Sequence, residues 1–288
     1  MEMRNKAFEM TALKESFVNA EQKWFGVIVD YLMLLYQNVH LPSHDISHHI
    51  RVWNICKKLL MEIDRVGIPV SNELVEQALV ASLFHDTGLL RDKSERHGRQ
   101  SRLICEQFFC KQAHLQASNL TPVLNAIENH DNKSLKAVKQ DSKSPKSDLL
   151  TIISTADDLD AFGYIGVYRY LEIYSLRGIP FKSIPEKVIS NLDVRYENFK
   201  RSYSMLTNFY RMYKELYDLA KNFYLNVERE VNSNSGEYGE YSLICKNLID
   251  SLVDRKLDIK GAIAHGILSN SSEVSLNFLI SLKDELEI

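Results

Sequence analysis

The stretch SLFHDTGLLRD, residues 82–92, places a histidine and a carboxylate at the end of an apolar run. His85 and Asp86 directly follow Ala78 to Phe84, whose spacing is that of a buried helical face. By Born estimates, moving a lone ionised carboxylate out of water costs on the order of tens of kcal/mol. The pair therefore either lies at a surface or meets a positive charge in the interior.

Four other segments place a histidine or an aspartate at the end of an apolar helical stripe. His48 begins the stripe that continues through Val52 and Ile55, with offsets of three and four residues that put side chains on one helix face. The same spacing leads to four more residues: His97, His130, Asp157 and Asp160. If these ends converge, the carboxylates require a cation, and imidazole with carboxylate suits a divalent metal ion.

Helical periodicity must supply the elements that position these side chains, because strand-like alternation is scarce. The 11 Gly and 6 Pro among 288 residues fit long helices with short connections, so we predict an all-α fold. Helices are expected at 12–38, 46–64, 72–85, 97–115, 121–130, 147–160, 163–177, 185–231, 240–255 and 273–286.

Two polar segments punctuate this pattern. Residues 131–147 are predicted to form a mobile loop, and residues 231–240 are predicted to form a linker. We therefore divide the chain into a helical core with its N-terminal helix over 1–230 and a C-terminal helical extension over 231–288. A break near Asn191 is expected in the longest helix.

Composition argues against several classes of function. Thirty-five Lys and Arg against 38 Asp and Glu leave a formal charge of −3, so no long nucleic acid is expected as a partner. The most apolar stretch, residues 24–36, is too short and too polar to cross a membrane. Four cysteines without CxxC spacing indicate buried thiols in a reducing compartment, and the N-terminus is unlike a secretory signal. The expected location is the cytoplasm.

The order of these segments resembles the HD superfamily of metal-dependent phosphohydrolases. HDISHHIRV is similar to that family's H-D-x-x-H-x-x-R-V, and ASLFHDTG to its A-x-L-x-H-D-x-G. ERHGRQS, AIENH and ADDLDAFGYIGVYR are similar to H-x-x-x-S, I-x-x-H and A-D-x-L-D-x-x-G-x-x-G-x-x-R. The resemblance covers about residues 44–180. It implies an HD-domain helical bundle with additional N- and C-terminal helices.

The resemblance also implies a metal centre in which a metal-activated water cleaves a phosphoester. The ion would be divalent (Mn, Mg, Fe, Co, Ni or Zn) and held by four side chains: His48, His85, Asp86 and Asp157. In relatives, positions like His97 and His130 either bind a second ion, with Asp86 bridging, or contact the substrate phosphate. One or two ions therefore stay open. Asp86, His97 and Asp160 are expected to take part in catalysis, with Asp160 orienting a histidine or Arg169.

The expected substrate is a nucleotide or a small phosphorylated metabolite. A basic cluster around His97 provides candidate phosphate contacts in Lys93, Arg96 and Arg99. Arg51 shares one side of a helix with His48 and is expected to contact the phosphate or to be a partner of a metal ligand. Some nucleotide-cleaving relatives place a catalytic glutamate shortly after the HD pair, where this chain has Leu89 and Leu90. The leaving-group acid and the substrate are therefore left open.

Two alternatives remain at this point. One is an HD-type mixed-valence di-iron oxygenase, which needs both His97 and His130 as ligands. The other is a non-catalytic nucleotide or metal sensor, which the missing glutamate and the terminal helices would favour. Tyr and Phe at helical spacing in residues 202–225 are typical of core or dimer packing, so a homodimer is also left open.

Overall fold

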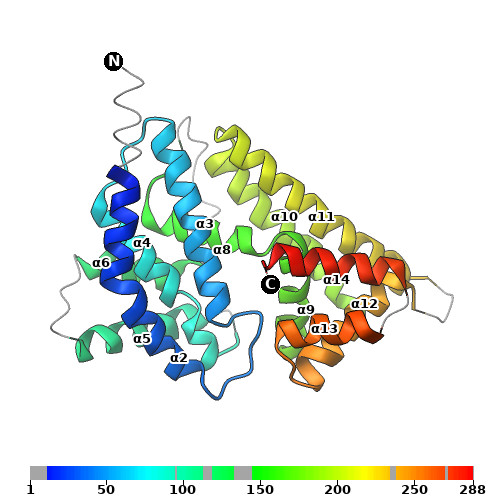
Figure 1. The fold of residues 1–288 in the computed structure, drawn as a ribbon. Coiled ribbons are helices and arrows are strands. Elements are labelled where there is room, and N and C mark those ends of the chain that lie inside the picture. Colours follow the sequence, from blue (N-terminus) through cyan, green and yellow to red (C-terminus); the bar gives the residue numbers. More distant parts are fainter. Residues whose placement is uncertain are drawn as a thin grey trace. The chain divides into compact units, whose positions relative to one another are not determined.

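The structure is a computed structural model that describes residues 12–94, 96–112, 119–132, 145–233, 238–269 and 272–287. These described residues form helices and no strands, which confirms the all-α class (Figure 1). They group into two compact units. Unit 1 contains residues up to 39 together with 44–159 and 198–210, and unit 2 contains 40–43, 160–197 and 211 onward. The domain boundary expected after residue 230 does not coincide with this grouping and stays a prediction.

Unit 1 carries the helices with the candidate ligands, drawn from blue to green in Figure 1. Residues 12–20 are helical. The elements that follow are η1 (Glu21–Phe25), α2 (Gly26–Tyr36), α3 (Ile46–Arg65), α4 (Asn72–Phe84), η2 (Thr87–Leu90), α5 (His97–Lys111), α6 (Leu120–Asn129) and α8 (Leu149–Asp160), whose last residue belongs to unit 2. The core of unit 1 contains large, fully buried side chains, among them Trp24, Trp53, Phe84 and Phe108.

Helix caps determine where two of the candidate ligands lie. The Asp45 side chain accepts hydrogen bonds from the backbone N–H groups of Ser47 and His48, so α3 begins with His48 in its first turn. Ser71 caps α4 in the same way, and that helix ends at Phe84. The ligand candidates of these helices therefore lie at the start of α3 and at the end of α4, two helices that pack together.

Two glycines allow close contacts that bring the remaining helices to the same place. A Cβ on Gly88 would collide with the backbone oxygen of His97 and lie 2.6 Å from the backbone nitrogen of Ser101. Gly88 also donates its N–H to Ser101 Oγ at 2.8 Å. A Cβ on Gly98 would lie 2.5 Å from the backbone oxygen of Glu128. Glycine at these two positions lets η2, α5 and α6 pack at backbone contact.

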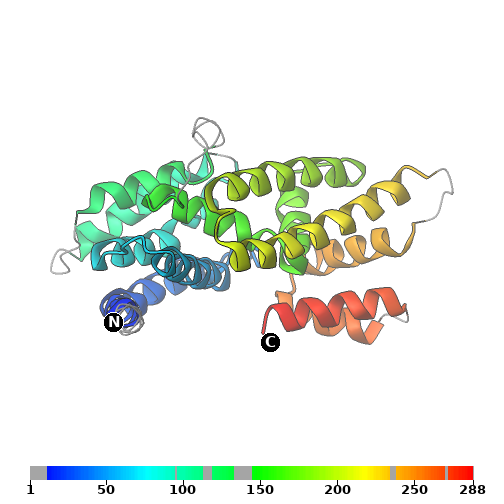
Figure 2. The ribbon, with the colours of Figure 1, turned by 90° about the horizontal axis from the view of Figure 1, so that it is seen from above.

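Unit 2 is also helical. Its elements are α9 (Gly163–Leu176), η3 (Phe181–Ser183), most of α10 (Ile184–Tyr203), most of α11 (Thr207–Val231), α12 (Glu240–Ile249), η4 (Asp250–Asp254), α13 (Ile259–Ser269) and α14 (Glu273–Glu285). Tyr224 of α11 donates its hydroxyl to the Val167 carbonyl of α9 at 2.8 Å. Helices α13 and α14 lie side by side in Figure 2 and pack against each other.

Two expectations about the helices were wrong: the position of a break, and the absence of a helix. The long helix breaks at residues 204–206, between α10 and α11, and not near Asn191. The Asn191 amide donates to Tyr174 Oη at 2.9 Å, so its polar group is satisfied without interrupting the helix. Helix α13 was missed because Gly261 and Gly266 weaken its helical pattern. Within the described residues, no helix is long and apolar enough to cross a bilayer.

Candidate metal centre

Four of the predicted ligands meet at one point in the interior of unit 1. His48 Nε2 lies 3.1 Å from His85 Nε2 and 3.3 Å from Asp86 Oδ2. Asp157 Oδ1 lies 3.7 Å from the Nε2 atom of His48 and 3.8 Å from that of His85. All four side chains are buried, and one ligand atom from each lies within 4.8 Å of the others. The geometry brings together two imidazoles and two carboxylates, the set expected from the sequence.

The second oxygen of Asp86 belongs to an adjoining cluster. Asp86 Oδ1 lies 3.0 Å from His97 Nε2 and 3.0 Å from His130 Nε2. The two Nε2 atoms are 3.3 Å apart, and all three side chains are buried. Asp86 therefore presents one carboxylate oxygen to each cluster, which is the arrangement that two bridged ions need.

Backbone carbonyls orient three of the imidazoles. The Nδ1–H of His85 donates to Ser82 O at 2.8 Å, that of His97 to Ser94 O at 2.9 Å, and that of His130 to Ile127 O at 2.8 Å. A neutral imidazole that donates from Nδ1 carries its lone pair on Nε2, and in all three rings Nε2 faces the clusters. Lone pairs and carboxylate oxygens that face one another need a cation between them. The residues present therefore fit one or two divalent metal ions.

The pKa shifts of the metal-free protein also indicate that the buried carboxylate of Asp86 needs a nearby positive charge. Burial would raise the pKa of Asp86, but the charge of His85 and hydrogen bonds from the other imidazoles hold it well below its usual range. Burial would lower the pKa of His97, but the hydrogen bond to Asp86 and its charge raise it to about 9. Protons thus compensate the buried carboxylate when no metal does.

The remaining predicted site residues lie outside these two clusters. Asp160 is buried in unit 2, where Oδ2 lies 3.1 Å from Nη1 of Arg169, the partner suggested for it; a catalytic role for Asp160 stays a prediction. Arg51 is half-buried and donates from Nη1 to Ser47 Oγ at 3.0 Å. The side chains of three residues are exposed: Lys93, Arg96 and Arg99. Their contact with a phosphate also stays a prediction.

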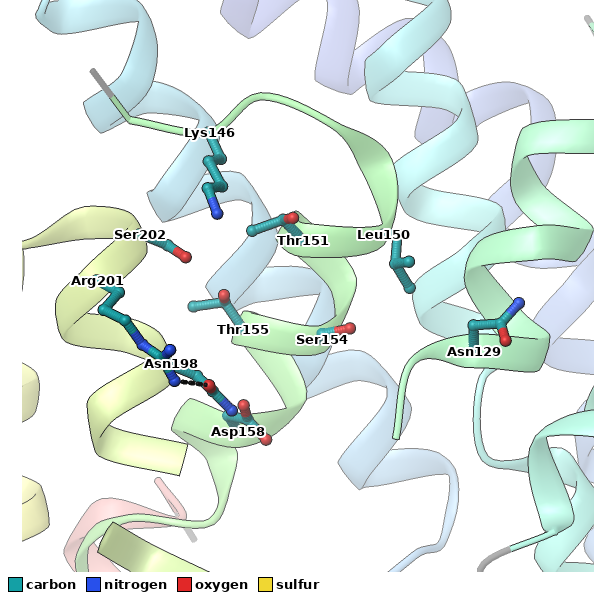
Figure 3. A pocket seen from close by; sticks show the side chains of 10 residues that line it. All are labelled: Asn129, Lys146, Leu150, Thr151, Ser154, Thr155, Asp158, Asn198, Arg201 and Ser202. Atoms are coloured by element: carbon teal, nitrogen blue, oxygen red, sulfur yellow. Dashed lines mark hydrogen bonds between the residues drawn. The ribbon is translucent and has the colours of Figure 1, made fainter. Parts of the chain in front are cut away.

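Sequence reasoning set aside two residues that the structure buries in unit 1. From the sequence, His44 is by default not expected to be a ligand, yet its Nε2 lies 3.8 Å from Asp86 Oδ2. Its spacing of four residues before His48 was the available signal, but His44 precedes the cap of α3. Asp158 lies about 100° around the helix from Asp157, so the sequence predicts that it faces solvent or acts as an occasional base, yet it is only 2% exposed. It lines a polar pocket beside α8 (Figure 3).

One comparison with known proteins is consistent with this geometry. Residues 45–161 match the family model described as HD domain. This span contains every member of both clusters. Curated proteins and solved structures gave no significant match.

Proposed function

We propose that this protein is a metal-dependent phosphohydrolase, because residues 45–161 match the HD-domain family model. The proposed substrate is a nucleotide or a small phosphorylated metabolite, and the proposed reaction is hydrolysis of its phosphoester. The observation that carries the proposal is the bridging position of Asp86 between two buried ligand clusters. Bound divalent ions would supply a Lewis acid for the phosphoryl oxygen and hydroxide at neutral pH.

The charge balance of the two clusters supports an anionic substrate. Asp86 and Asp157 supply two negative charges, so one divalent ion gives a neutral site if the imidazoles are neutral. A second divalent ion leaves an excess of two positive charges in a buried site. An anionic phosphate would compensate that excess, and burial would strengthen the attraction because the local dielectric constant is low.

The chain's own residues hold the site in shape. The carbonyls of Ser82, Ser94 and Ile127 fix the rotation of three imidazoles, so Nε2 needs no reorientation when an ion binds. Asp86 lies at the end of α4, one residue after His85, and its two oxygens are committed to different clusters. Asp86 would therefore be a ligand shared by both ions if two are bound.

The test compares wild type with His85→Ala and Asp86→Ala, assayed on a panel of phosphoesters with each candidate metal. Both variants should lose hydrolysis by about a hundredfold or more while keeping the helical circular dichroism signal. A variant of a half-buried histidine that belongs to neither cluster, His265→Ala, serves as the control that should keep full activity. Metal-dependent hydrolysis retained in both variants would reject the proposal. Wild-type protein that binds metal but hydrolyses no phosphoester would favour the sensor instead.

A second candidate, the mixed-valence di-iron oxygenase, is favoured by one observation. The adjoining cluster of Asp86, His97 and His130 offers ligands for a second ion, which this chemistry requires. Elemental analysis of protein purified without chelator separates the two candidates. Two equivalents of iron together with oxygen consumption that depends on an added carbon substrate would support the oxygenase. Phosphoester hydrolysis with one or two equivalents of another divalent ion would exclude it.

A further inference from the structure

A pocket lined mostly by residues with polar side chains lies in unit 1 along helix α8 (Figure 3), the helix that also carries Asp157. It contains about 470 Å³ of space, its open mouth included. Its walls come from α8, from the C-terminal turns of α10, from Asn129 at the end of α6 and from the connecting segment with Lys146. None of the residues assigned to the two metal clusters lines it.

The helical repeat places this pocket beside the metal centre. Ser154 lines the pocket and lies three residues before Asp157, so the two side chains share one face of α8. Their Cα atoms are separated along the helix axis by about 4.5 Å, from a rise of 1.5 Å per residue. At the end of α6, Asn129 lines the pocket and is followed directly by His130. A small molecule with a phosphate at the clusters could therefore extend into the pocket.

The lining is suited to oxygen-rich anions. Lys146 and Arg201 supply two cations against the one carboxylate of Asp158, an excess of one positive charge. In Figure 3 the Lys146 ammonium group points between the hydroxyl-bearing side chains of Thr151 and Ser202. Cations and hydroxyl groups gathered in this way are typical of phosphate or carboxylate recognition.

A further group needs a hydrogen-bond acceptor. Asn198 accepts a hydrogen bond on Oδ1 from Arg201 Nη2 at 2.9 Å. Its Nδ2 atom is buried and, within the described residues, has no hydrogen-bond partner. A buried donor without a partner is unfavourable, and a ligand oxygen would satisfy it. None of the described lining residues is aromatic, so the pocket offers no ring on which a nucleobase could stack.

We propose that this pocket binds the non-reacting end of the substrate, and that the substrate is a phosphorylated sugar or polyol with a second anionic group. This inference rests on the proposed phosphohydrolase function and narrows its substrate class. Asp158 and Asn198 would bind hydroxyl groups, and Lys146 with Arg201 would bind the second anion. A nucleotide whose base must enter this pocket is disfavoured.

The proposal has two features, the sugar or polyol and the second anionic group. Four substrates test them separately: fructose 6-phosphate, fructose 1,6-bisphosphate, adenosine monophosphate and adenosine 3′,5′-bisphosphate. The fructose bisphosphate should have a kcat/KM about tenfold or more above both the monophosphate and the adenosine compounds. The double variant Lys146→Met with Arg201→Met should raise KM for the bisphosphate about tenfold and change fructose 6-phosphate less than about twofold. Ser202→Ala, a smaller change, should raise the same KM by about threefold.

The matched control is Lys200→Met, which removes an exposed cation next to Arg201 that does not line the pocket, and should change neither KM. Metal content and circular dichroism are measured for every variant. Calorimetry with fructose 1,6-bisphosphate on chelator-treated protein measures binding without turnover.

The outcomes separate the two proposals. Hydrolysis with a nucleotide preference, or with KM values that the pocket variants leave unchanged, would overturn the pocket proposal and leave the phosphohydrolase intact. If the protein hydrolyses no phosphoester but binds fructose 1,6-bisphosphate, and the double variant weakens this binding, the pocket proposal is supported and the phosphohydrolase proposal is rejected. Absence of both binding and hydrolysis would overturn both.

Discussion

Asp86 Oδ1 lies 3.0 Å from His130 Nε2, although the two residues are 44 positions apart in the chain. The other oxygen of the same carboxylate faces His48. One side chain thus belongs to two groups of ligands, and its placement depends on the end of α4 and the end of α6 meeting.

Removal of a ligand from the adjoining cluster should affect one ion only. We expect His130→Ala to lower the bound metal from two equivalents to one and to reduce kcat/KM by about a hundredfold. His48→Ala should instead lower the occupancy of both sites, because the ligands of the first cluster also hold Asp86 in position. The measurement is elemental analysis after gel filtration. One equivalent in wild type and in His130→Ala alike would contradict a two-ion site.

The metal-free protein should lose stability as the pH rises. The folded pKa of His97 is raised to about 9, above the unfolded value of about 6.5. The stabilisation from its protonated form is therefore fully present below about pH 6.5 and is lost as the pH rises through about 9. Urea unfolding in the presence of a chelator measures the free energy of unfolding at each pH, and His97→Gln is the comparison. A profile over this range that is identical in wild type and His97→Gln would contradict it.

Saturation with metal should reverse that trend. Imidazole must lose its proton to bind an ion, so protons compete with the metal and affinity increases with pH. We expect the midpoint of thermal unfolding with excess metal to rise between about pH 6 and 8, where the chelated protein becomes less stable. Parallel profiles with and without metal would argue against imidazole ligation.

Gly88→Ala should destabilise the protein and disturb metal binding together. The added Cβ would meet backbone atoms of His97 and Ser101, which cannot move as a flexible side chain can. We expect a loss of about 3 kcal/mol in the free energy of unfolding, at the upper end for overpacking. Gly26→Ala is the matched control, because a Cβ on this helical glycine meets nothing within 4 Å. That control should be neutral or stabilising by up to about 1 kcal/mol. Equal effects of the two substitutions in thermal unfolding would contradict the close contact.

The exposed cations should act on substrate association at a distance. Replacement of Lys93, Arg96 and Arg99 by Gln should raise KM by about threefold at low salt and by much less at 1 M salt, where the Debye length is about 3 Å. Pocket residues such as Arg201 should keep their effect at high salt because direct hydrogen bonds are screened less. Steady-state kinetics at two ionic strengths distinguishes these cases. A salt-independent effect of the exposed cations would mean direct contact with the substrate.

Several features could be predicted from residue pattern because they depend on local interactions. The apolar repeats before His85 and Asp157 indicate helices that end in ligand-competent side chains, and α3 begins at the residue expected. Local sequence pattern predicted helices less well where helix propensity and tertiary contacts favour different structures. Asn191 suggested a break, but a hydrogen bond to Tyr174 lets α10 continue. Helix α13 forms despite two glycines.

Residue types and their order along the chain determined the helical class and the candidate ligands, since each depends on neighbours a few positions away. Only the tertiary structure decided which oxygen of Asp86 faces which histidines, because that requires four chain segments to meet within a few ångströms. The burial of Asp158 in a polar pocket was decided in the same way. Helical periodicity gives the face on which a side chain lies, and the packing of other helices determines what covers that face.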